Sequence, residues 1–375
     1  MRAVIAGGGV AGAAVACLLG RDALLLEREA GPHDKICGEF ISHAAQTYLA
    51  RLGVDLRALG AVPIHAVRLV HGRRVATARL PFRAVSLSRR VLDEALLQRA
   101  ATKGAEIMRG HAVRGWADGM LDVDGVGRIP APVLFLATGK HDLRGIRRAP
   151  RTPPADLVGL KMYLTLAPAQ EADLAGHVEL LLFPGGYAGL QMVEGGAANL
   201  CLLIDRARFE QAGRTWPGVQ RMLERSLPHV ARRLADAVPR LDRPLSIFRV
   251  PYGFIHAPGP ADPAGLFRLG DQMGVIPSFC GDGVSIALHT AFAAVAALRD
   301  GGPSTRTTSA YHRRMGGDLA GPIGRAEALY RLSRARPGLV VGAVRAWPAS
   351  LGWMARRTRL PDRTLPAAFE GSRLS

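Results

Sequence analysis

A glycine-rich loop near the start of the chain has the residue types and spacing that bind the phosphates of a dinucleotide. Residues 7–12 read Gly-Gly-Gly-Val-Ala-Gly and fit the pattern GxGxxG, between a short apolar run and a run of small residues. In such a loop Gly7 allows a tight turn, Gly9 lets a pyrophosphate approach the backbone, and Gly12 lets helix and strand pack closely. The free N–H groups of the following helix favour a bound anion, so this segment predicts a dinucleotide site.

Two acidic residues stand where carboxylates would accept hydrogen bonds from such a cofactor. Glu27 follows Gly7 by 20 residues, the spacing at which a carboxylate accepts the hydroxyls of an adenosine ribose. Asp271 ends a second apolar run far downstream and precedes a long run of small residues. Its carboxylate suits the ribitol of FAD, and the positive end of the following helix would stabilise an anionic reduced flavin. The plainer interpretation of Asp271, an ordinary helix cap, stays open.

These residues need a parallel sheet that brings distant strand ends together. The hydrophobic pattern predicts a βαβ unit over 1–27, a helix over 88–102 and a buried strand over 133–137. A strand over 266–270 and a helix over 284–298 return to the same pattern. Between them, short runs with glycine turns predict an antiparallel sheet followed by a helix. These runs span 157–166, 178–183, 187–193 and 198–204, and the helix spans 217–237.

The predicted fold class is therefore α/β with an α+β insert. It consists of a GR2-type, Rossmann-like FAD-binding domain, an antiparallel-sheet substrate domain and a C-terminal helical segment. The predicted boundaries are 1–150 for the first part of the FAD-binding domain (with candidate substrate-domain strands near 62–85), 151–257 for the substrate domain, 258–300 for the returning segment and 301–375 for a helical cap.

Composition narrows the partners. The formal net charge is +18, but only four of the 49 basic residues are lysine, and no basic run with interleaved aromatics occurs, so nucleic-acid binding is not expected. The charge would suit an anionic membrane surface, an acidic carrier or NADPH. The four cysteines form no CxxC pair and no His/Cys/Asp cluster has metal spacing, which predicts reduced thiols, a cytoplasmic location and no metal site. Neither a signal peptide nor a membrane-spanning segment is expected.

The ordered landmarks of the chain resemble the class A flavoprotein monooxygenase and geranylgeranyl reductase superfamily, whose fold is that of para-hydroxybenzoate hydroxylase. They cover roughly the first 300 residues: the glycine loop with Glu27, Ser-Arg-Arg-Val-Leu-Asp at 88–93, Leu-Ala-Thr-Gly at 136–139, and Gly-Asp at 270–271 with its following glycines. Lys-Ile-Cys-Gly-Glu-Phe at 35–40 looks most like the geranylgeranyl reductase branch, whose relatives include secondary-metabolism flavoproteins encoded beside type III polyketide synthases.

The resemblance implies a set of site residues. Cys37 is a candidate proton donor, His141 a candidate base or phosphate ligand, and Tyr187 a candidate substrate contact; for each of them, simple packing is the alternative. Lys161 and Tyr163 alternate along one run and are expected to face the same side. The expected cofactor-binding residues are Gly7, Gly9, Val10, Ala11, Gly12, Glu27, Arg28, Arg89, Thr138, Gly139, Gly270, Asp271, Pro277, Gly281, Gly283 and Val284.

The expected activity is that of an FAD-dependent oxidoreductase. We favour a monooxygenase that hydroxylates a phenolic, polyketide-like or other lipophilic small molecule through a C4a-hydroperoxyflavin. The alternatives are a geranylgeranyl reductase-like alkene reductase and a non-catalytic flavin-binding partner protein. The Asp-Gly motif that the hydroxylase branch uses for NADPH contact is absent at 137–142. The resemblance therefore leaves two electron donors open: NADPH or NADH directly, or a reductase partner. The halogenase motif WxWxIP is also absent, so halogenation is not favoured.

The C-terminal region allows two interpretations. Between Arg345 and Arg357 the pattern fits either an amphipathic surface helix, with Trp347 and Trp353, or a helical cap over the substrate cleft. We favour the cap. Peripheral membrane contact is the alternative, and it would suit a lipophilic substrate.

Overall fold

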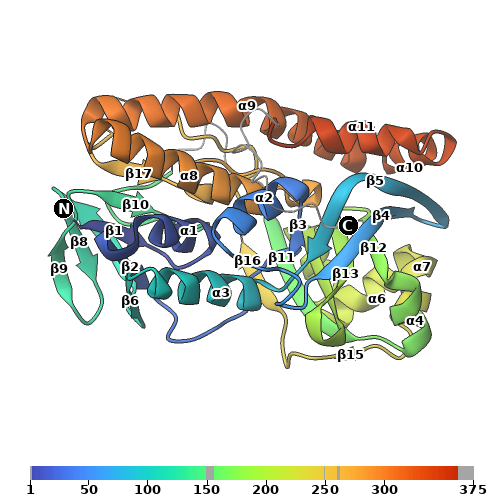
Figure 1. The fold of residues 1–375 in the computed structure, drawn as a ribbon. Coiled ribbons are helices and arrows are strands. Elements are labelled where there is room, and N and C mark those ends of the chain that lie inside the picture. The colour runs from blue at the N-terminus through green and yellow to red at the C-terminus, as the bar shows by residue number, and fades with distance from the viewer. Residues whose placement is uncertain (1, 149–155, 249, 260–261, 362–375) are drawn as a thin grey trace.

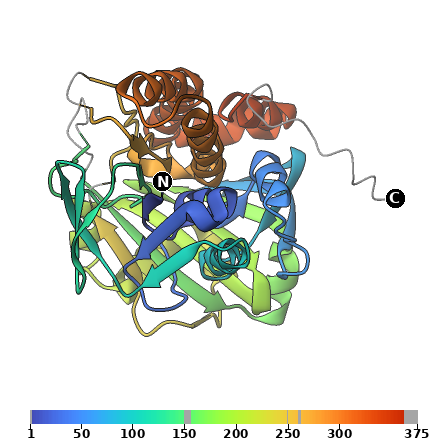
Figure 2. The same cartoon turned by 60° about the vertical axis from the view of Figure 1, so that its left-hand side comes forward.

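Two sheets meet side by side in the computed structural model, and the helices cover their outer faces (Figures 1 and 2). The structure describes residues 2–148, 156–248, 250–259 and 262–361. The domain boundary predicted between residues 150 and 151 lies outside these residues.

The first sheet is parallel and has the strand order β17-β10-β1-β2-β6. Its buried strands are short and apolar, as expected where both faces are covered. One face carries α1, α3 and α8, and the other carries a small sheet of β7, β8 and β9 that the sequence did not predict. The bounds are β1 Ala3–Ala6, α1 Val10–Leu19, β2 Ala23–Glu27, α3 Arg89–Thr102, β6 Glu106–Arg109, β7 Val113–Ala117, β8 Met120–Val123, β9 Gly127–Pro130, β10 Leu134–Leu136, β17 Leu266–Arg268 and α8 Gly283–Gly301.

The second sheet has nine strands in the order β15-β11-β14-β13-β12-β4-β5-β3, with β16 also paired to β11. The expectation of a purely antiparallel sheet is wrong at one place, because β12 pairs with β4 in parallel. The bounds are β3 Phe40–Ile41, β4 Val62–His71, β5 Arg74–Ser86, β11 Leu157–Thr165, β12 Gly176–Phe183, β13 Gly186–Val193, β14 Ala197–Asp205, β15 Val238–Pro239 and β16 Leu245–Phe248.

Helices cover both faces of this second sheet. The helix expected over 217–237 is two helices, since Pro228 has no N–H to continue the first, and the chain is extended at Leu227. These two helices are α6 (Trp216–Ser226) and α7 (Pro228–Arg233). The other helices near this sheet are short: α2 His43–Arg51, α4 Pro168–Leu174 and α5 Arg206–Gln211.

Three C-terminal helices close the molecule. The long α9 (Thr305–Ala335) lies beside α8, and α10 (Pro337–Ala346) and α11 (Ala349–Arg357) pack on β5 of the nine-stranded sheet (Figure 1). They come after the returning strand β17 and cover the space between the two sheets. Among the described residues, no helix is long and apolar enough to cross a membrane.

Candidate functional site

The glycine loop after β1 adopts a conformation that only glycine fits at two positions. Gly7 has φ of 107°, and a Cβ there would lie 2.6 Å from the carbonyl oxygen of Ala137. A Cβ on Gly12 would lie 1.9 Å from the carbonyl oxygen of Gly7. The loop can therefore turn tightly between β1 and α1 only because these residues lack side chains.

Glu27 lies at the end of β2, directly beneath this loop. It is buried, and its carboxylate accepts hydrogen bonds from the backbone N–H of Gly8 at 2.7 Å and of Glu29 at 3.0 Å. Together with Gly8, it lines a small hollow that His33 and Arg109 complete. This is the geometry expected for the adenosine end of a dinucleotide, with lone pairs of the carboxylate left for a ribose. Arg28, the next residue, pairs with Glu29 on the surface.

Two cationic side chains gather beside Gly9. A Cβ built on Gly9 would lie 3.3 Å from Nη2 of Arg89 and 3.6 Å from Nζ of Lys35. Asp93 holds both of them, at 2.8 Å from Arg89 and 2.9 Å from Lys35. A pyrophosphate on the loop would meet two positioned cations and the N-terminus of α1. Sequence reasoning singled out Arg89 and missed Lys35, although Lys35 opens the noted segment 35–40.

The returning segment reaches the same edge of the parallel sheet. A Cβ on Gly270 would lie 3.7 Å from Cβ of Ala11, so the Gly-Asp turn touches the helix that follows the glycine loop. The strand predicted over 266–270 stops at Arg268, and Gly270–Gln272 form a 3-10 turn, η3. Both glycine and acidic motifs therefore border one site, as a single extended cofactor requires.

Asp271 forms an ion pair with Lys140 at 3.0 Å, which sequence reasoning did not foresee. The nearby Asp271 carboxylate raises the pKa of Lys140. The turn that carries Lys140 is held in place by Gln272, whose amide donates to the carbonyls of Gly139 and His141 at 2.9 Å each. The hydroxyl of Thr138 closes the turn by donating to the carbonyl of His141.

The start of α8 lies next to this edge. Pro277 leads into a 3-10 turn, η4 (Ser278–Cys280), and Gly281 follows with φ of 69°. Gly283 begins α8, and Val284 is buried in its first turn. A Cβ on Gly281 would lie 2.7 Å from the ring of Phe40 in β3, so these expected cofactor residues place the N-terminus of α8 next to the nine-stranded sheet.

A cavity of about 170 Å³ opens from this edge and runs between the nine-stranded sheet and helices α9 to α11. Cys37, Lys140 and Gly281 line one part of it. Most of the rest is aliphatic, with side chains such as Leu69, Leu180 and Val340 from β4, β12 and α10. The cavity thus joins the predicted flavin position to a long apolar space.

The polar groups of the cavity form a chain of hydroxyls. The hydroxyls of Tyr187 and Tyr252 lie 3.1 Å apart, and that of Tyr252 donates to Oγ of Ser278 at 2.8 Å. Burial raises the pKa of both tyrosines, so they are neutral hydrogen-bonding groups at physiological pH. Ser278 belongs to η4, so the chain leads from the cavity wall towards the start of α8.

A buried ionic cluster holds one cavity wall in place. The Glu39 carboxylate accepts hydrogen bonds from Nζ of Lys161 at 2.5 Å, from the Tyr163 hydroxyl at 2.7 Å and from Nδ2 of Asn199 at 2.9 Å. Asn199 also donates to the carbonyl of Cys37. Burial raises the pKa of Glu39, and Lys161 opposes that shift. Lys161 and Tyr163 do share a side, as their alternation predicted, but they lie behind the cavity wall.

The three catalytic candidates do not come together. Cys37 and Tyr187 both line the cavity, whereas His141 does not line it and lies on the surface, with Nε2 3.5 Å from Nη1 of Arg28. This position gives no support to His141 as a base. A second thiol, Cys201, lines the cavity as well, and burial raises its pKa to about 12.

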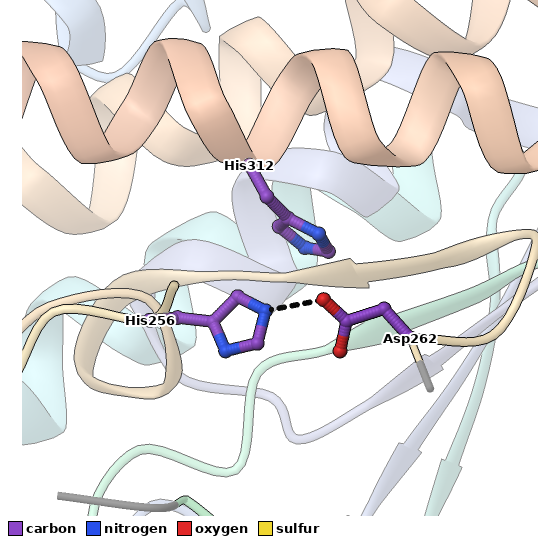
Figure 3. Close-up of side chains that lie close together, drawn as sticks. All are labelled: His256, Asp262 and His312. Carbon is purple, nitrogen blue, oxygen red and sulfur yellow. Dashed lines mark hydrogen bonds and ion pairs between the residues drawn. The ribbon is translucent and has the colours of Figure 1, made fainter. Parts of the chain in front are cut away.

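A separate trio, His256, Asp262 and His312, lies beside the edge strand β17, and its potential ligand atoms lie within 4.8 Å of one another (Figure 3). The sequence spacing gave no sign of it. Nε2 of His312 already accepts the backbone N–H of Arg268, which leaves the proton of the neutral ring on Nδ1. Nε2 of His256 lies 2.9 Å from the Asp262 carboxylate. Because the buried Arg268 adds a positive charge nearby, the arrangement suits a hydrogen-bonded cluster better than a cation site.

Comparison with known proteins places the fold. No protein-family model and no curated sequence matches the chain. Among solved structures, the flavin-dependent brominase Bmp2 matches with a TM-score of 0.76 and 16% identity, over 97% of this chain and 95% of Bmp2. PqsL of P. aeruginosa, in complex with 2-aminobenzoylacetate, matches with a TM-score of 0.70 and 18% identity, over 90% of this chain and 97% of PqsL.

A third structure contains a cofactor. The halogenase PltM in complex with phloroglucinol and FAD matches with a TM-score of 0.70 and 13% identity, over 89% of this chain and 76% of PltM. These likenesses confirm the predicted fold class, because the chain shares its fold with the flavin-dependent brominase Bmp2, the halogenase PltM and PqsL.

Proposed function

We propose that this protein is an FAD-dependent monooxygenase that hydroxylates a lipophilic phenol or a related electron-rich small molecule. The observation that carries the proposal is the cavity: it begins at Cys37, Lys140 and Gly281, next to the expected flavin position, and continues as an aliphatic space. A bound ring would sit at the flavin end and an apolar tail beyond it.

The residues around the glycine loop fit FAD. Glu27 would receive the adenosine ribose, Arg89 and Lys35 the pyrophosphate, and Asp271 the ribitol. Since Asp271 is paired with Lys140, the pair would reorganise around the ribitol hydroxyls or hold Lys140 towards the ring. The N-terminus of α8 would stabilise negative charge on the reduced ring.

When bound and reduced, the flavin supplies an activated oxygen atom from O₂. The chain supplies position and protection. Aliphatic walls exclude water, and the Tyr187–Tyr252 pair offers neutral hydroxyls that can hydrogen-bond a phenol and carry its proton towards Ser278. The Glu39 cluster keeps the Cys37 wall rigid.

Flavin-dependent alkene reduction is the second candidate, and one observation favours it. Two thiols, Cys37 and Cys201, line the cavity, and the raised pKa of Cys201 keeps that thiol protonated. Such a group could deliver a proton to a carbon that receives a hydride.

The first experiment is to purify the protein, record its flavin absorbance and identify the extracted cofactor. A folded preparation that is colourless and takes up no added FAD would overturn the proposal. Stopped-flow reduction with NADPH and NADH, then with an added flavin reductase, identifies the electron donor.

The second experiment separates the reactions. Alkylphenols with chains of increasing length are tested with reduced enzyme, with and without O₂, and with chloride or bromide present. Monooxygenation predicts that hydroxylated product forms only with O₂, and that KM falls as the alkyl chain becomes longer. Halogenated product, or turnover of an isoprenoid without O₂, would assign a different reaction. No substrate effect on flavin reoxidation or reduction would indicate a non-catalytic flavin-binding protein.

A further inference from the structure

Exposed apolar side chains are concentrated on the C-terminal helices that roof the cavity. Of the eight large apolar residues that the described part of the chain leaves exposed, four lie between Leu332 and Trp353. Leu339 is 63% exposed, Trp347 64% and Trp353 54%. Single exposed residues are ordinary, but a group on three consecutive helices that includes two tryptophans needs a reason.

The same segment is strongly basic. Residues 328–361 contain seven arginines and no aspartate or glutamate. Four of the arginines are exposed and form no ion pair with a carboxylate among the described residues: Arg336, Arg345, Arg356 and Arg357. We call these four arginines together with Leu339, Trp347 and Trp353 the Trp–Arg surface.

Arginines and apolar residues share helix faces in this surface. On α11, Arg357 lies four residues after Trp353, with its guanidinium 4.4 Å from the centre of the indole ring. Arg336 lies at the N-cap of α10, three residues before Leu339. Tryptophan and arginine side by side are typical of helices that lie at a lipid headgroup layer, where the ring reaches the apolar boundary and the charge stays at the phosphates.

The opposite faces of these helices belong to the cavity. Val340 of α10 and Leu351 and Met354 of α11 line the cavity, so these two helices, which pack on β5 (Figure 1), also carry part of its wall. The sequence offered a cap over the cleft and an amphipathic surface helix as alternatives. The same two helices have both features, because one face lines the cavity and the other is exposed.

We propose that the Trp–Arg surface docks the protein on an anionic phospholipid bilayer. Charge selects this occupant: a second copy of the chain would place two acid-free basic surfaces against each other and repel it. That the bilayer delivers a lipophilic substrate to the cavity rests on the proposed function, but the docking itself does not.

The test uses the full-length, FAD-loaded protein and unilamellar vesicles. We expect co-sedimentation with phosphatidylcholine vesicles that contain phosphatidylglycerol, and little with phosphatidylcholine alone. The triple variant R345Q/R356Q/R357Q is expected to weaken the vesicle partition coefficient by at least about tenfold, and W347A/W353A to remove the blue shift of tryptophan emission on binding.

The matched control is R128Q/R232Q/R313Q, which removes the same charge from exposed arginines elsewhere. It should leave vesicle binding almost intact. The docking surface would be overturned if this control lost as much vesicle binding as the triple variant, or if W347A/W353A bound vesicles as well as the wild type does. The proposal would also fail if the wild type were a dimer that binds no vesicles and that dissociates in W347A/W353A.

Two readouts keep folding and function apart from docking. Flavin absorbance and melting temperature should be unchanged in all variants, because none of the substituted residues lines the cavity. Turnover of a short, water-soluble phenol without vesicles should also be unchanged. If vesicles bind as expected but no phenol is hydroxylated, the proposed reaction fails and the docking surface stands.

Discussion

At the scale of single residues, the site depends on charges that are held in place before any ligand arrives. Asp93 holds Arg89 and Lys35 beside the glycine loop. Burial alone would raise the pKa of Asp93, but these two cations outweigh burial and lower the pKa. Two cations so anchored lose little freedom when they meet a phosphate.

Asp271→Ala is expected to weaken FAD retention about 10- to 100-fold, because the carboxylate proposed to accept the ribitol hydroxyls is lost and Lys140 loses its partner. The ratio of flavin to protein absorbance after purification measures the effect. Asp271→Asn should restore part of the FAD retention, and Asp300→Ala, at an exposed carboxylate near the end of α8, should leave FAD retention unchanged. An Asp271→Ala protein that purifies fully yellow would contradict the ribitol contact.

Lys161→Met is expected to destabilise the protein by about 3–5 kcal/mol, since it leaves the buried Glu39 carboxylate without its cation. Urea unfolding measures the change. Adding Glu39→Gln to Lys161→Met should recover part of the loss, because the uncompensated charge is gone. Lys103→Met, at an exposed lysine, serves as the control. An unchanged midpoint in Lys161→Met would show that the cluster contributes no stability.

At the scale of elements, Glu179 joins three parts of the nine-stranded sheet and its cover. From β12 it accepts hydrogen bonds from Arg68 of β4 at 2.5 Å and from Arg233 of α7 at 2.8 Å, and it lies 2.9 Å from His229. Burial raises the pKa of Glu179, but the hydrogen bonds of His229 and Arg233 outweigh it and lower the pKa from 4.5 to about 2.

Because the folded pKa is depressed, Glu179 stabilises the protein fully above pH 4.5 and loses this contribution as the pH falls towards 2. Glu179→Gln is expected to cost about 3 kcal/mol of unfolding free energy at pH 7, and the difference from the wild type should shrink below pH 4.5. Urea titrations between pH 3.5 and 7 measure it.

The control is Glu210→Gln, which removes a surface partner of Arg214 and should cost at most about 0.5 kcal/mol. If the wild type and Glu179→Gln differ by the same amount at every pH, the linkage is wrong.

At the scale of the whole molecule, one ligand would connect segments that are far apart in the chain. The glycine loop follows β1, Arg89 begins α3, and Asp271 follows β17, yet these positions border one site. A ligand that binds all of them stabilises the folded state by mass action.

Apoprotein with FAD at about 100 times Kd is therefore expected to melt about 3–4 °C higher than without it. FMN, which lacks the adenosine half that Glu27 and the glycine loop would hold, should give a smaller rise. Differential scanning fluorimetry with an extrinsic dye measures both. Equal shifts with FAD and FMN would contradict an adenosine site at Glu27.

The sequence alone determined the parts of the fold that depend on local spacing. Gly7 and Gly12 could be assigned because the tight turn between strand and helix leaves no room for a side chain there. The strands β1, β2 and β10 could be assigned because short apolar runs next to glycine turns are typical of buried parallel strands. Lys161 and Tyr163 were placed on one side because strand residues alternate.

Only the tertiary structure decided which distant groups meet. The pairing of Lys140 with Asp271, the joining of Glu39 to Lys161, and the exposure of His141 all depend on how separate loops dock, and no local periodicity encodes that. Likewise, the pattern at 345–357 allowed both a cap, which we favoured, and a surface helix. Packing on β5 showed that a helix buried on one face can still present tryptophan and arginine on the other.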